Sequence, residues 1–348
     1  MHASNPVLMI RADANVAIAT GHVMRCLALA QAWQDTGGRA IFAMAESVPA
    51  IDARIAAERI EAINIKERPG SLADAACTAD LASRCNATWI VADGYHFGSE
   101  YQHRLKHSEL KLLFLDDNGR AGHYVADVVL DSNPHADEGL YANRQSYTRL
   151  LLGPAYALLR REFRAYRDWK RTIPNIGRKV LVTLGGTDPD DVTLRVIEGL
   201  KTLKIKGLEA VVVVGGGNPH FRTLEAAVSG KDQIRLIKDA SNMPELMAWA
   251  DVAISAAGST CWEMCLLRVP TLLISLASHH FPISQWLDRK GVGSDIGSTQ
   301  QLSSQTIACK LESLLHDGEA RARMSRRAQK LVDGTGALKV TTLLKNHE

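Results

Sequence analysis

The sequence lacks the features that would place the protein in a membrane or on a nucleic acid. Its longest strongly apolar run, Val269 to Ala277, is far shorter than the roughly 20 residues that a membrane-spanning helix needs. The formal net charge is only +3, and no block of arginine or lysine forms a basic face. The most basic stretch, Glu319 to Lys330, has helical spacing and is typical of a solvated helix surface. We therefore expect neither a membrane nor a nucleic acid as partner.

The cysteines likewise show no metal-binding or disulfide pattern. No C-x-x-C pair occurs, and the N-terminal MHASNPVLMI has no charged region ahead of its short apolar stretch, unlike a signal peptide. We therefore expect a cytoplasmic protein with reduced thiols and no zinc site. The six cysteines are Cys26, Cys77, Cys85, Cys261, Cys265 and Cys309.

Apolar segments alternate with helical segments along the chain. The apolar segments run without polar alternation, which is typical of parallel strands covered on both faces, and Gly21 to Asp35 has helical spacing that stops at Gly37-Gly38. The strands expected in the first half are VLMIRA, AIFAMA, TWIVAD, KLLFLD and DVVLD, with helices near 71–84 and 100–107. Those expected in the second half are KVLVTL, EAVVVVG, IRLIK, DVAIS and PTLLIS, with helices near 191–203, 219–227, 243–250 and 259–267.

The length of 348 residues exceeds one ordinary core, and the pattern restarts after the polar segment RDWKRTIPNIGR. We expect an α/β protein with two Rossmann-like parallel-sheet domains. The N-terminal domain spans residues 1–155, a linker spans 156–178, and the C-terminal domain spans 179–335. The sequence also predicts a C-terminal helix over 336–348, which can pack back on the N-terminal domain.

Ligands of open parallel sheets bind beyond the carboxyl ends of the strands. In the second half LGGTDPDD, GGGNPH and SAAGSTCWE follow strands, and their glycines let backbone N–H groups approach an anion. None of them is a P-loop or a dinucleotide fingerprint. Each alone is compatible with ordinary turn chemistry, but three in one domain favour a ligand that carries a diphosphate.

Glu263 has two interpretations. The segment TCWE fits a capping box, with Thr260 at the helix cap and Glu263 reaching back to the backbone. In a loop that faces a ligand, the same carboxylate can instead accept hydrogen bonds from two ribose hydroxyls. The residues alone leave both open.

His22 lies in the first turn of the predicted helix, where the helix dipole favours a neutral, proton-accepting imidazole. Such a group suits a general base near neutral pH, although a histidine that packs beneath the loop is the plainer interpretation. Acids at neighbouring strand ends favour a reaction site; they are Asp13, Asp93, Asp116 and Asp117. The last two also suggest Mg²⁺ ligands, but such pairs often cap helices or anchor loops, so we expect no metal.

Six segments resemble, in order and over nearly the whole chain, the UDP-2,4-diacetamido-2,4,6-trideoxy-β-L-altropyranose hydrolases of pseudaminic acid biosynthesis. They are RADANVAIATGHVMRCLALA, VADGYHF, FLDDN, LLLGPAYALLRREF, VTLGGTDPDD and SAAGSTCWEMCLLRVPTLLISLA. That family is similar in fold to the peptidoglycan N-acetylglucosaminyltransferase. The resemblance implies a GT-B-like fold with two domains facing a cleft, UDP held by the C-terminal domain, and catalytic groups presented by the N-terminal domain.

The resemblance also implies roles for individual residues. His22 resembles the catalytic base, Tyr95 a sugar-contacting tyrosine, and Glu263 the ribose-binding glutamate of GT-B enzymes. The chain departs from the family at His279-His280, where Asn-Gln is usual, and this leaves the exact sugar open. The expected substrate-binding residues are Asp13, Gly21, Arg25, Asp93, Tyr95, His279 and His280, and the expected UDP-binding residues are Gly185, Gly186, Gly258, Ser259, Thr260 and Glu263.

The expected activity is metal-independent hydrolysis of a UDP-linked 2,4-diacetamido-2,4,6-trideoxy hexose to UDP and free sugar, with inversion at C1 and no cofactor. His22 would accept the proton of the attacking water. Two alternatives stay open: an inverting GT-B glycosyltransferase with a UDP-sugar donor, and a non-catalytic nucleotide-sugar-binding protein. A small-molecule UDP-sugar is the expected partner, and the sequence gives no indication of the oligomeric state.

Overall fold

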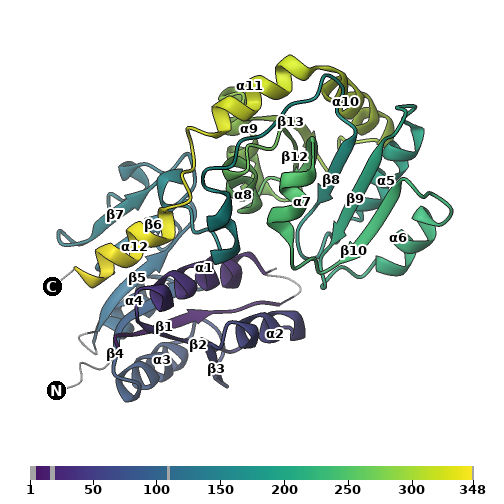
Figure 1. Cartoon of the computed structure of the whole chain (residues 1–348). Helices are drawn as coiled ribbons and strands as arrows, with labels where there is room; N and C mark the ends of the chain where they lie inside the picture. Colours follow the sequence, from purple (N-terminus) through teal and green to yellow (C-terminus); the bar gives the residue numbers. More distant parts are fainter. Residues whose placement is uncertain (1–4, 16–19, 108–109, 347–348) are drawn as a thin grey trace. The chain divides into compact units, whose positions relative to one another are not determined.

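The computed structural model describes residues 5–15, 20–107 and 110–346, and these form two compact units (Figure 1). The C-terminal unit runs from Glu162 to Asp333. The N-terminal unit contains the chain up to Arg161 and also the segment from Gly334 onward. The segment 156–178, predicted to be a linker, is therefore shared between the two units, with the division after Arg161.

The N-terminal unit is built on a parallel sheet with seven strands among the described residues, in the order β3-β2-β1-β4-β5-β6-β7. The strands β1 and β4 lie side by side although two strands separate them in the sequence, so the direction of strand addition reverses between them. The strands are β1 (Val7–Ala12), β2 (Arg39–Met44), β3 (Glu61–Asn64), β4 (Ala87–Asp93), β5 (Lys111–Leu115), β6 (Val128–Asp131) and β7 (Arg149–Leu152).

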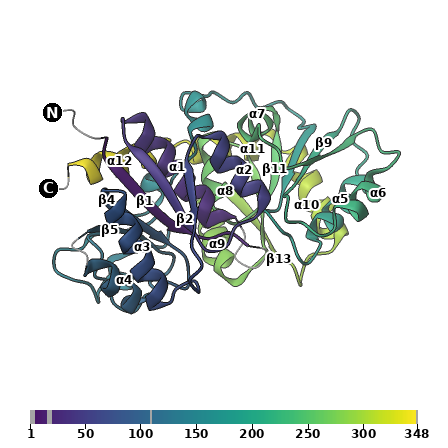
Figure 2. The ribbon, with the colours of Figure 1, turned by 90° about the horizontal axis from the view of Figure 1, so that it is seen from below.

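Helices cover both faces of this sheet (Figure 2). On one face α1 (Gly21–Asp35), α2 (Pro49–Ala57) and α12 (Gly336–Lys345) pack against apolar side chains of the sheet such as Leu8 and Ile10. On the other face α3 (Leu72–Arg84) and α4 (Ser99–Lys106) pack against a second set that includes Met9. Successive residues of β1 thus point to opposite faces, which explains why this buried strand is apolar except for Arg11.

The last helix, α12, is part of the N-terminal unit. Its Val340 and Leu344 join the apolar core to which α1 also contributes, and the Trp89 indole donates a 3.0 Å hydrogen bond to the Leu344 carbonyl oxygen; Figure 1 shows the helix itself. Gly336, at its first turn, has no room for a side chain, because a Cβ atom there would lie 2.2 Å from the Ala157 carbonyl oxygen. Short 3-10 helices complete the described part of this unit and the boundary: Glu138–Tyr141, Pro154–Tyr156 and Arg161–Tyr166.

The C-terminal unit repeats the plan with a six-stranded parallel sheet in its described residues, in the order β10-β9-β8-β11-β12-β13. Here the reversal lies between β8 and β11. The strands are β8 (Lys179–Thr183), β9 (Glu209–Val214), β10 (Ile234–Lys238), β11 (Val252–Ala256), β12 (Thr271–Ser275) and β13 (Gly293–Ser298). The helices are α5 (Val192–Thr202), α6 (Phe221–Val228), α7 (Met243–Trp249), α8 (Thr260–Leu266), the 3-10 turn Ser278–His280, α9 (Phe281–Arg289), α10 (Ser304–His316) and α11 (Gly318–Ala328).

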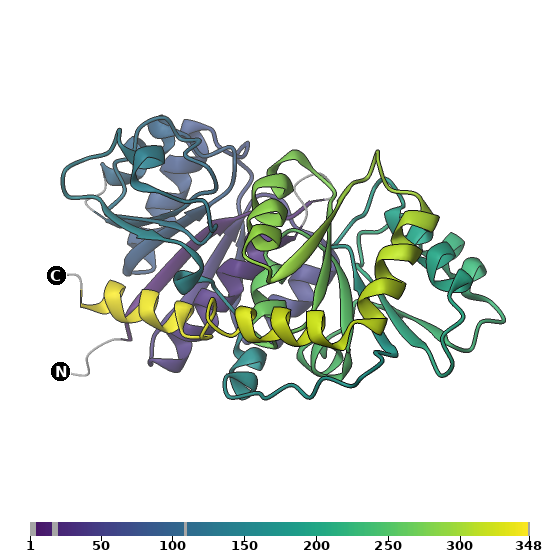
Figure 3. The same ribbon diagram turned by 90° about the horizontal axis from the view of Figure 1, so that it is seen from above.

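Helices α5 and α10 lie side by side on one face of this second sheet (Figure 3). Gly199 permits the close approach, since a Cβ atom at that position would lie 2.8 Å from the Ser304 carbonyl oxygen. The apolar residues of the two helices, among them Val196 and Leu311, share one core with the sheet. No helix in the described ranges is long and apolar enough to cross a membrane.

The predicted two parallel-sheet domains are confirmed, and most of the predicted strands and helices are present. The structure adds edge elements that the sequence analysis missed. Strand β3 is short and largely exposed, and β13 has the sequence GSDIGS with a single large apolar residue. Neither forms the apolar run by which the buried strands are recognised.

Candidate active site

A group of polar side chains in the N-terminal unit lies at the carboxyl ends of β1 and β4. These paired strands flank the point where the order of strands reverses, which is the position where open α/β sheets bind ligands. Asp93 is the last residue of β4. Helix α1 follows β1 and begins at Gly21, so His22 is brought to the same edge of the sheet.

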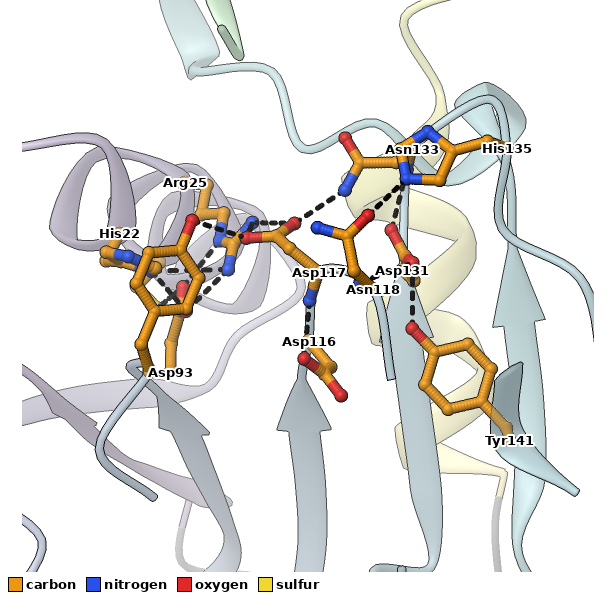
Figure 4. Close-up of polar contacts among 12 residues, drawn as sticks. His22, Arg25, Asp93, Asp116, Asp117, Asn118, Asp131, Asn133, His135 and Tyr141 are labelled. Carbon is orange, nitrogen blue, oxygen red and sulfur yellow. Dashed lines mark hydrogen bonds and ion pairs between the residues drawn. The ribbon is translucent and has the colours of Figure 1, made fainter. Parts of the chain in front are cut away.

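His22 and Asp93 form a close pair (Figure 4). The Nδ1 atom of His22 lies 2.7 Å from Oδ1 of Asp93, and the Asp93 side chain is fully buried. Burial alone would raise the pKa of Asp93, but the charge of Arg25 and the hydrogen bonds from Arg25 and His22 outweigh it and hold that pKa well below its usual range. A contact this short between nitrogen and an ionised carboxylate needs a proton on the nitrogen, so Nδ1 donates to Asp93.

This pairing fixes the tautomer of the neutral imidazole. With the proton on Nδ1, the lone pair is on Nε2, and no described residue lies within hydrogen-bonding distance of Nε2. His22 is 7% exposed. The pair therefore presents a basic nitrogen oriented by a buried carboxylate, which is the arrangement of a histidine general base.

Arg25 lies between two carboxylates. Its Nε and Nη2 atoms each donate at 2.6 Å to Asp93, and Nη1 donates at 2.9 Å to Oδ1 of Asp117. Burial would raise the pKa of Asp117, but the guanidinium lowers it, so both acids are ionised. Arg25 and Asp93 are both expected to bind the substrate; in the structure their side chains are hydrogen-bonded to each other, and Asp93 also to His22.

Tyr95 follows β4 and leaves an exposed ring next to His22. The two rings meet edge to face with their centres 4.6 Å apart, and the Tyr95 hydroxyl donates at 3.3 Å to Asp117. The side chain is 42% exposed. The Arg120 guanidinium lies over the same ring, 4.6 Å from its centre. An exposed aromatic ring held from three sides is suited to pack against a sugar.

The polar network continues through the loops after β5 and β6. Asp116 accepts hydrogen bonds from the Tyr124 hydroxyl and from the backbone N–H of Asp117 and of Arg120, so it anchors its own loop. Asp131, at the end of β6, is fully buried, and burial raises its pKa to about 6. Asn133 donates at 2.7 Å to Asp117 and so joins the β6 loop to the site.

The structure also shows the surroundings of two further predicted residues, Asp13 and Gly21. Asp13 has a fully buried side chain, forms a 2.7 Å ion pair with Arg11, and accepts from the backbone N–H of Ala45 and of Glu46. It therefore ties the loop after β1 to the loop after β2 and lies away from solvent. Gly21 is the first residue of α1, and a Cβ atom there would meet nothing within 4 Å.

The predicted UDP-binding glycines lie at the strand reversal of the second sheet. Gly185 and Gly186 follow β8, and Gly258 to Thr260 lead from β11 into α8; β8 and β11 are paired neighbours. Gly185 has a φ of 85°, which favours glycine. Gly215, after β9, approaches so closely that a Cβ atom there would lie 2.5 Å from the Gly186 Cα atom. The glycine turns after β8 and β9 therefore lie so close together that the backbone leaves no room for a side chain at Gly215.

The structure places Ser259, and not Thr260 as the predicted capping box required, at the cap position of the helix that carries Glu263. Helix α8 begins at Thr260 with Ser259 at the cap position, and the Ser259 side chain makes no capping hydrogen bond. Glu263 is half-buried in the first turn.

His280 is placed by the turn that precedes α9. Its Nδ1 atom accepts a 3.2 Å hydrogen bond from the Leu276 backbone N–H, and burial together with His279 lowers its pKa to about 4. The neutral ring therefore carries its proton on Nε2, which lies 3.7 Å from the position of a Cβ atom at Gly258. The two histidine rings meet edge to face, 4.5 Å apart. His280 thus brings an N–H donor to the glycine loop after β11.

Within the part of the chain that the structure describes, no group of three or more His, Cys, Asp or Glu side chains is placed to hold a metal ion. Sequence reasoning missed the polar residues of the β5 and β6 loops beyond Asp117, namely Asn118, Arg120, Asp131 and Asn133. Asp131 ends the predicted strand DVVLD, so the strand-end rule that selected Asp93 could also have selected it.

The two Rossmann-like sheets, each with its polar loops at the point of strand reversal, define a fold of the GT-B class. Residues 179–337 match the glycosyltransferase family 28 C-terminal domain. The Staphylococcus aureus MnaA–UDP co-structure superposes with a TM-score of 0.69 at 12% identity, over 99% of this chain and 96% of that chain.

Curated relatives are similar over most of the chain. It is 28% identical over 236 residues to the Bacillus subtilis spore coat polysaccharide biosynthesis protein SpsG, covering 68% of this chain and 69% of the relative. It is 25% identical over 293 residues to the Campylobacter jejuni UDP-2,4-diacetamido-2,4,6-trideoxy-β-L-altropyranose hydrolase, covering 82% of this chain and 97% of that protein. The predicted relation to these hydrolases and to GT-B glycosyltransferases is confirmed.

Proposed function

We propose that the protein is an enzyme that hydrolyses a UDP-linked 2,4-diacetamido-2,4,6-trideoxy hexose to UDP and free sugar, with inversion at C1. The observation that carries the proposal is the His22–Asp93 pair, which leaves Nε2 of a neutral imidazole as the basic nitrogen at the reversal point of the first sheet. Support for the substrate comes from the hydrolase relative and from the family 28 domain, which is typical of proteins that use nucleotide sugars.

In the proposed reaction a water molecule attacks C1 of the sugar. The new bond joins the water oxygen to C1, the bond between C1 and the diphosphate oxygen breaks, and its electron pair leaves with UDP. Nε2 of His22 accepts the water proton. Asp93 then stabilises the imidazolium, because its negative charge lies 2.7 Å from Nδ1. The sugar passes through a charge-spreading, oxocarbenium-like transition state.

The C-terminal unit is assigned the nucleotide. Backbone N–H groups of the loops at Gly185-Gly186 and at Gly258 to Thr260 would bind the diphosphate and stabilise the negative charge that develops on it, without a metal ion. Glu263 would accept hydrogen bonds from the two ribose hydroxyls. The neutral His280, whose Nε2–H lies beside Gly258, would add one side-chain donor to this site.

The test is release of UDP from UDP-sugars in the absence of any acceptor. Wild-type protein should release UDP steadily from the UDP-diacetamido-trideoxy hexose, and His22→Asn should lower kcat on the order of a hundredfold or more with little change in UDP affinity. His103→Asn, which changes an exposed histidine of the same unit, is the matched control and should leave kcat unchanged.

The family 28 match favours a second candidate, an inverting glycosyltransferase, in which His22 would deprotonate an acceptor hydroxyl instead of water. The same assay separates the two. UDP release that requires an added carbohydrate or lipid acceptor would replace the hydrolase proposal with the transferase, and tight UDP-sugar binding without release under either condition would identify a binding protein.

A further inference from the structure

Two asparagines that the proposed mechanism does not use lie at neighbouring strand ends beside the His22 network. Asn118 follows β5 and Asn133 follows β6. Their backbone N–H groups donate to the same carboxylate, that of Asp131, at 3.5 and 2.8 Å respectively. The Tyr141 hydroxyl donates to this carboxylate at 2.7 Å (Figure 4). The two asparagines are therefore placed as neighbours by one buried acid.

The side chain of Asn133 has only one possible orientation. Its Nδ2 atom donates at 2.7 Å to Oδ1 of Asp117, and because an ionised carboxylate only accepts hydrogen bonds, the amide nitrogen must face Asp117. The carbonyl oxygen consequently points away from Asp117, as Figure 4 shows. Among the described residues no group donates to this oxygen, although Asn133 is only 7% exposed.

In Asn118 the side-chain atom without a hydrogen-bond partner among the described residues is the amide nitrogen. Its backbone has a φ of 83°, a left-handed conformation that asparagine adopts more readily than most residues. Its side-chain oxygen is hydrogen-bonded to Nε2 of His135, and burial lowers the pKa of His135, so the ring is neutral near pH 7. The amide nitrogen of Asn118 has no acceptor within the described part of the chain, and Figure 4 shows it directed away from His135.

We propose that Asn118 and Asn133 bind an acylamino substituent of the sugar. The carbonyl oxygen of Asn133 accepts a hydrogen bond from the substituent's N–H, and the amide nitrogen of Asn118 donates to its acyl oxygen. A secondary amide carries one donor and one acceptor, and this pair of side chains leaves one of each unused. The inference rests on the proposed function and adds to it two residues that determine specificity.

The chemistry of the pair predicts which sugars it rejects. A sugar that carries a free amine at the same carbon is an ammonium near neutral pH, which offers donors only. The amide nitrogen of Asn118 would then face a cation instead of an acceptor. A binding site whose polar groups stay unpaired discriminates strongly against such a ligand.

The test compares three substrates: the UDP-linked diacetamido-trideoxy hexose and the two analogues in which one or the other acetamido group is a free amine. For wild type, kcat/KM should favour the diacetamido sugar over one analogue by at least about tenfold. Asn118→Asp replaces the unused donor with an anionic acceptor and should abolish or reverse that preference. Asn118→Gly keeps the positive φ, removes the side chain, and should reduce the preference without reversing it.

The matched control is Asn143→Asp. Asn143 also bonds to a histidine ring, at 2.8 Å from Nδ1 of His123, but it is exposed and outside the network. The control should leave the ratio of the kcat/KM values unchanged. A ratio that is also unchanged in folded Asn118→Asp or Asn118→Gly overturns the inference, as does an equal loss on all three sugars.

If wild-type protein releases no UDP from any of the three sugars, the proposed hydrolysis fails separately. The equilibrium dissociation constants of the same sugars are then compared. If the wild type prefers the diacetamido sugar in Kd and the Asn118 variants lose that preference, the acylamino site is supported. If the variants keep the preference, the inference is overturned.

Discussion

Replacing Asp93 with asparagine removes the group on which the orientation of His22 depends. Asp93 accepts hydrogen bonds from Nδ1 of His22, from Nε and Nη2 of Arg25, and from the Cys26 thiol. An asparagine has one acceptor and one NH₂ group in place of two acceptors. If the NH₂ group takes the place of Oδ1, it faces both Nδ1 of His22 and Nη2 of Arg25; it donates to Nδ1 and moves the imidazole proton to Nε2, so the basic nitrogen is lost. If it takes the place of Oδ2, it faces Nε of Arg25, and two donors confront each other in a buried site.

Both orientations lower activity, and we expect kcat to fall on the order of a hundredfold or more. The folded state should also lose about 3 kcal/mol, because a buried ion pair is broken, although Arg25 keeps its second partner, Asp117. The pKa of Asp93 is lowered in the folded state, so its contribution to stability is present above the ordinary pKa of about 3.8 and is lost as pH falls further. The difference in unfolding free energy between wild type and Asp93→Asn should therefore shrink below about pH 4.

The assays are UDP release and urea unfolding at pH 7 and pH 3. Asp127→Asn is the matched control, since Asp127 pairs with Lys106 at 2.8 Å in the same unit but outside the His22 network. The control should lose stability without losing kcat. If Asp93→Asn keeps most of the wild-type kcat, Asp93 does not orient a general base and the tautomer argument is wrong.

Three further predictions concern other parts of the structure. Glu263→Ala should weaken UDP binding by roughly 1.5–3 kcal/mol, the usual contribution of hydrogen bonds to a charged group, as measured by calorimetry with UDP; unchanged affinity would remove the ribose assignment. The double variant His279→Asn/His280→Gln should change the ranking of UDP-sugars by kcat/KM while inhibition by UDP stays within a few fold, and an unchanged ranking would show that these rings do not select the sugar. Burial raises the pKa of Asp131 to about 6, so the folded state holds an extra proton between about pH 4 and 6 and loses stability as pH rises through that window. The stability of Asp131→Asn relative to wild type, from urea unfolding, should consequently increase from pH 4 to 7, and a flat difference would contradict the raised pKa.

The buried elements were predictable from sequence because their environment restricts their composition. Helix α1 has the predicted bounds Gly21–Asp35, and β1 and β4 are largely apolar because helices cover both faces of the sheet. Strand β13, with its polar sequence GSDIGS, pairs through its backbone at an edge, and no side-chain pattern reveals it.

The site was predictable as a set of residues but not as a set of contacts. Asp93 was selected because it ends an apolar strand, and His22 because it lies in the first turn of a predicted helix. That they touch depends on the pairing of β1 with β4, which periodicity does not reveal. Asn133 was missed because it lies in an irregular segment, and its place is fixed by Asp117 and Asp131, which come from two different strand ends.

The central claim is that water activated by His22 attacks C1 of the sugar. Hydrolysis of the UDP-diacetamido-trideoxy hexose in ¹⁸O-labelled water, followed by mass spectrometry of both products, tests it most directly. The account predicts one ¹⁸O atom in the released sugar and none in UDP, with the same distribution in the residual turnover of Asp93→Asn and a rate that EDTA does not change. Label in the β-phosphate of UDP would show attack at phosphorus and would contradict the account.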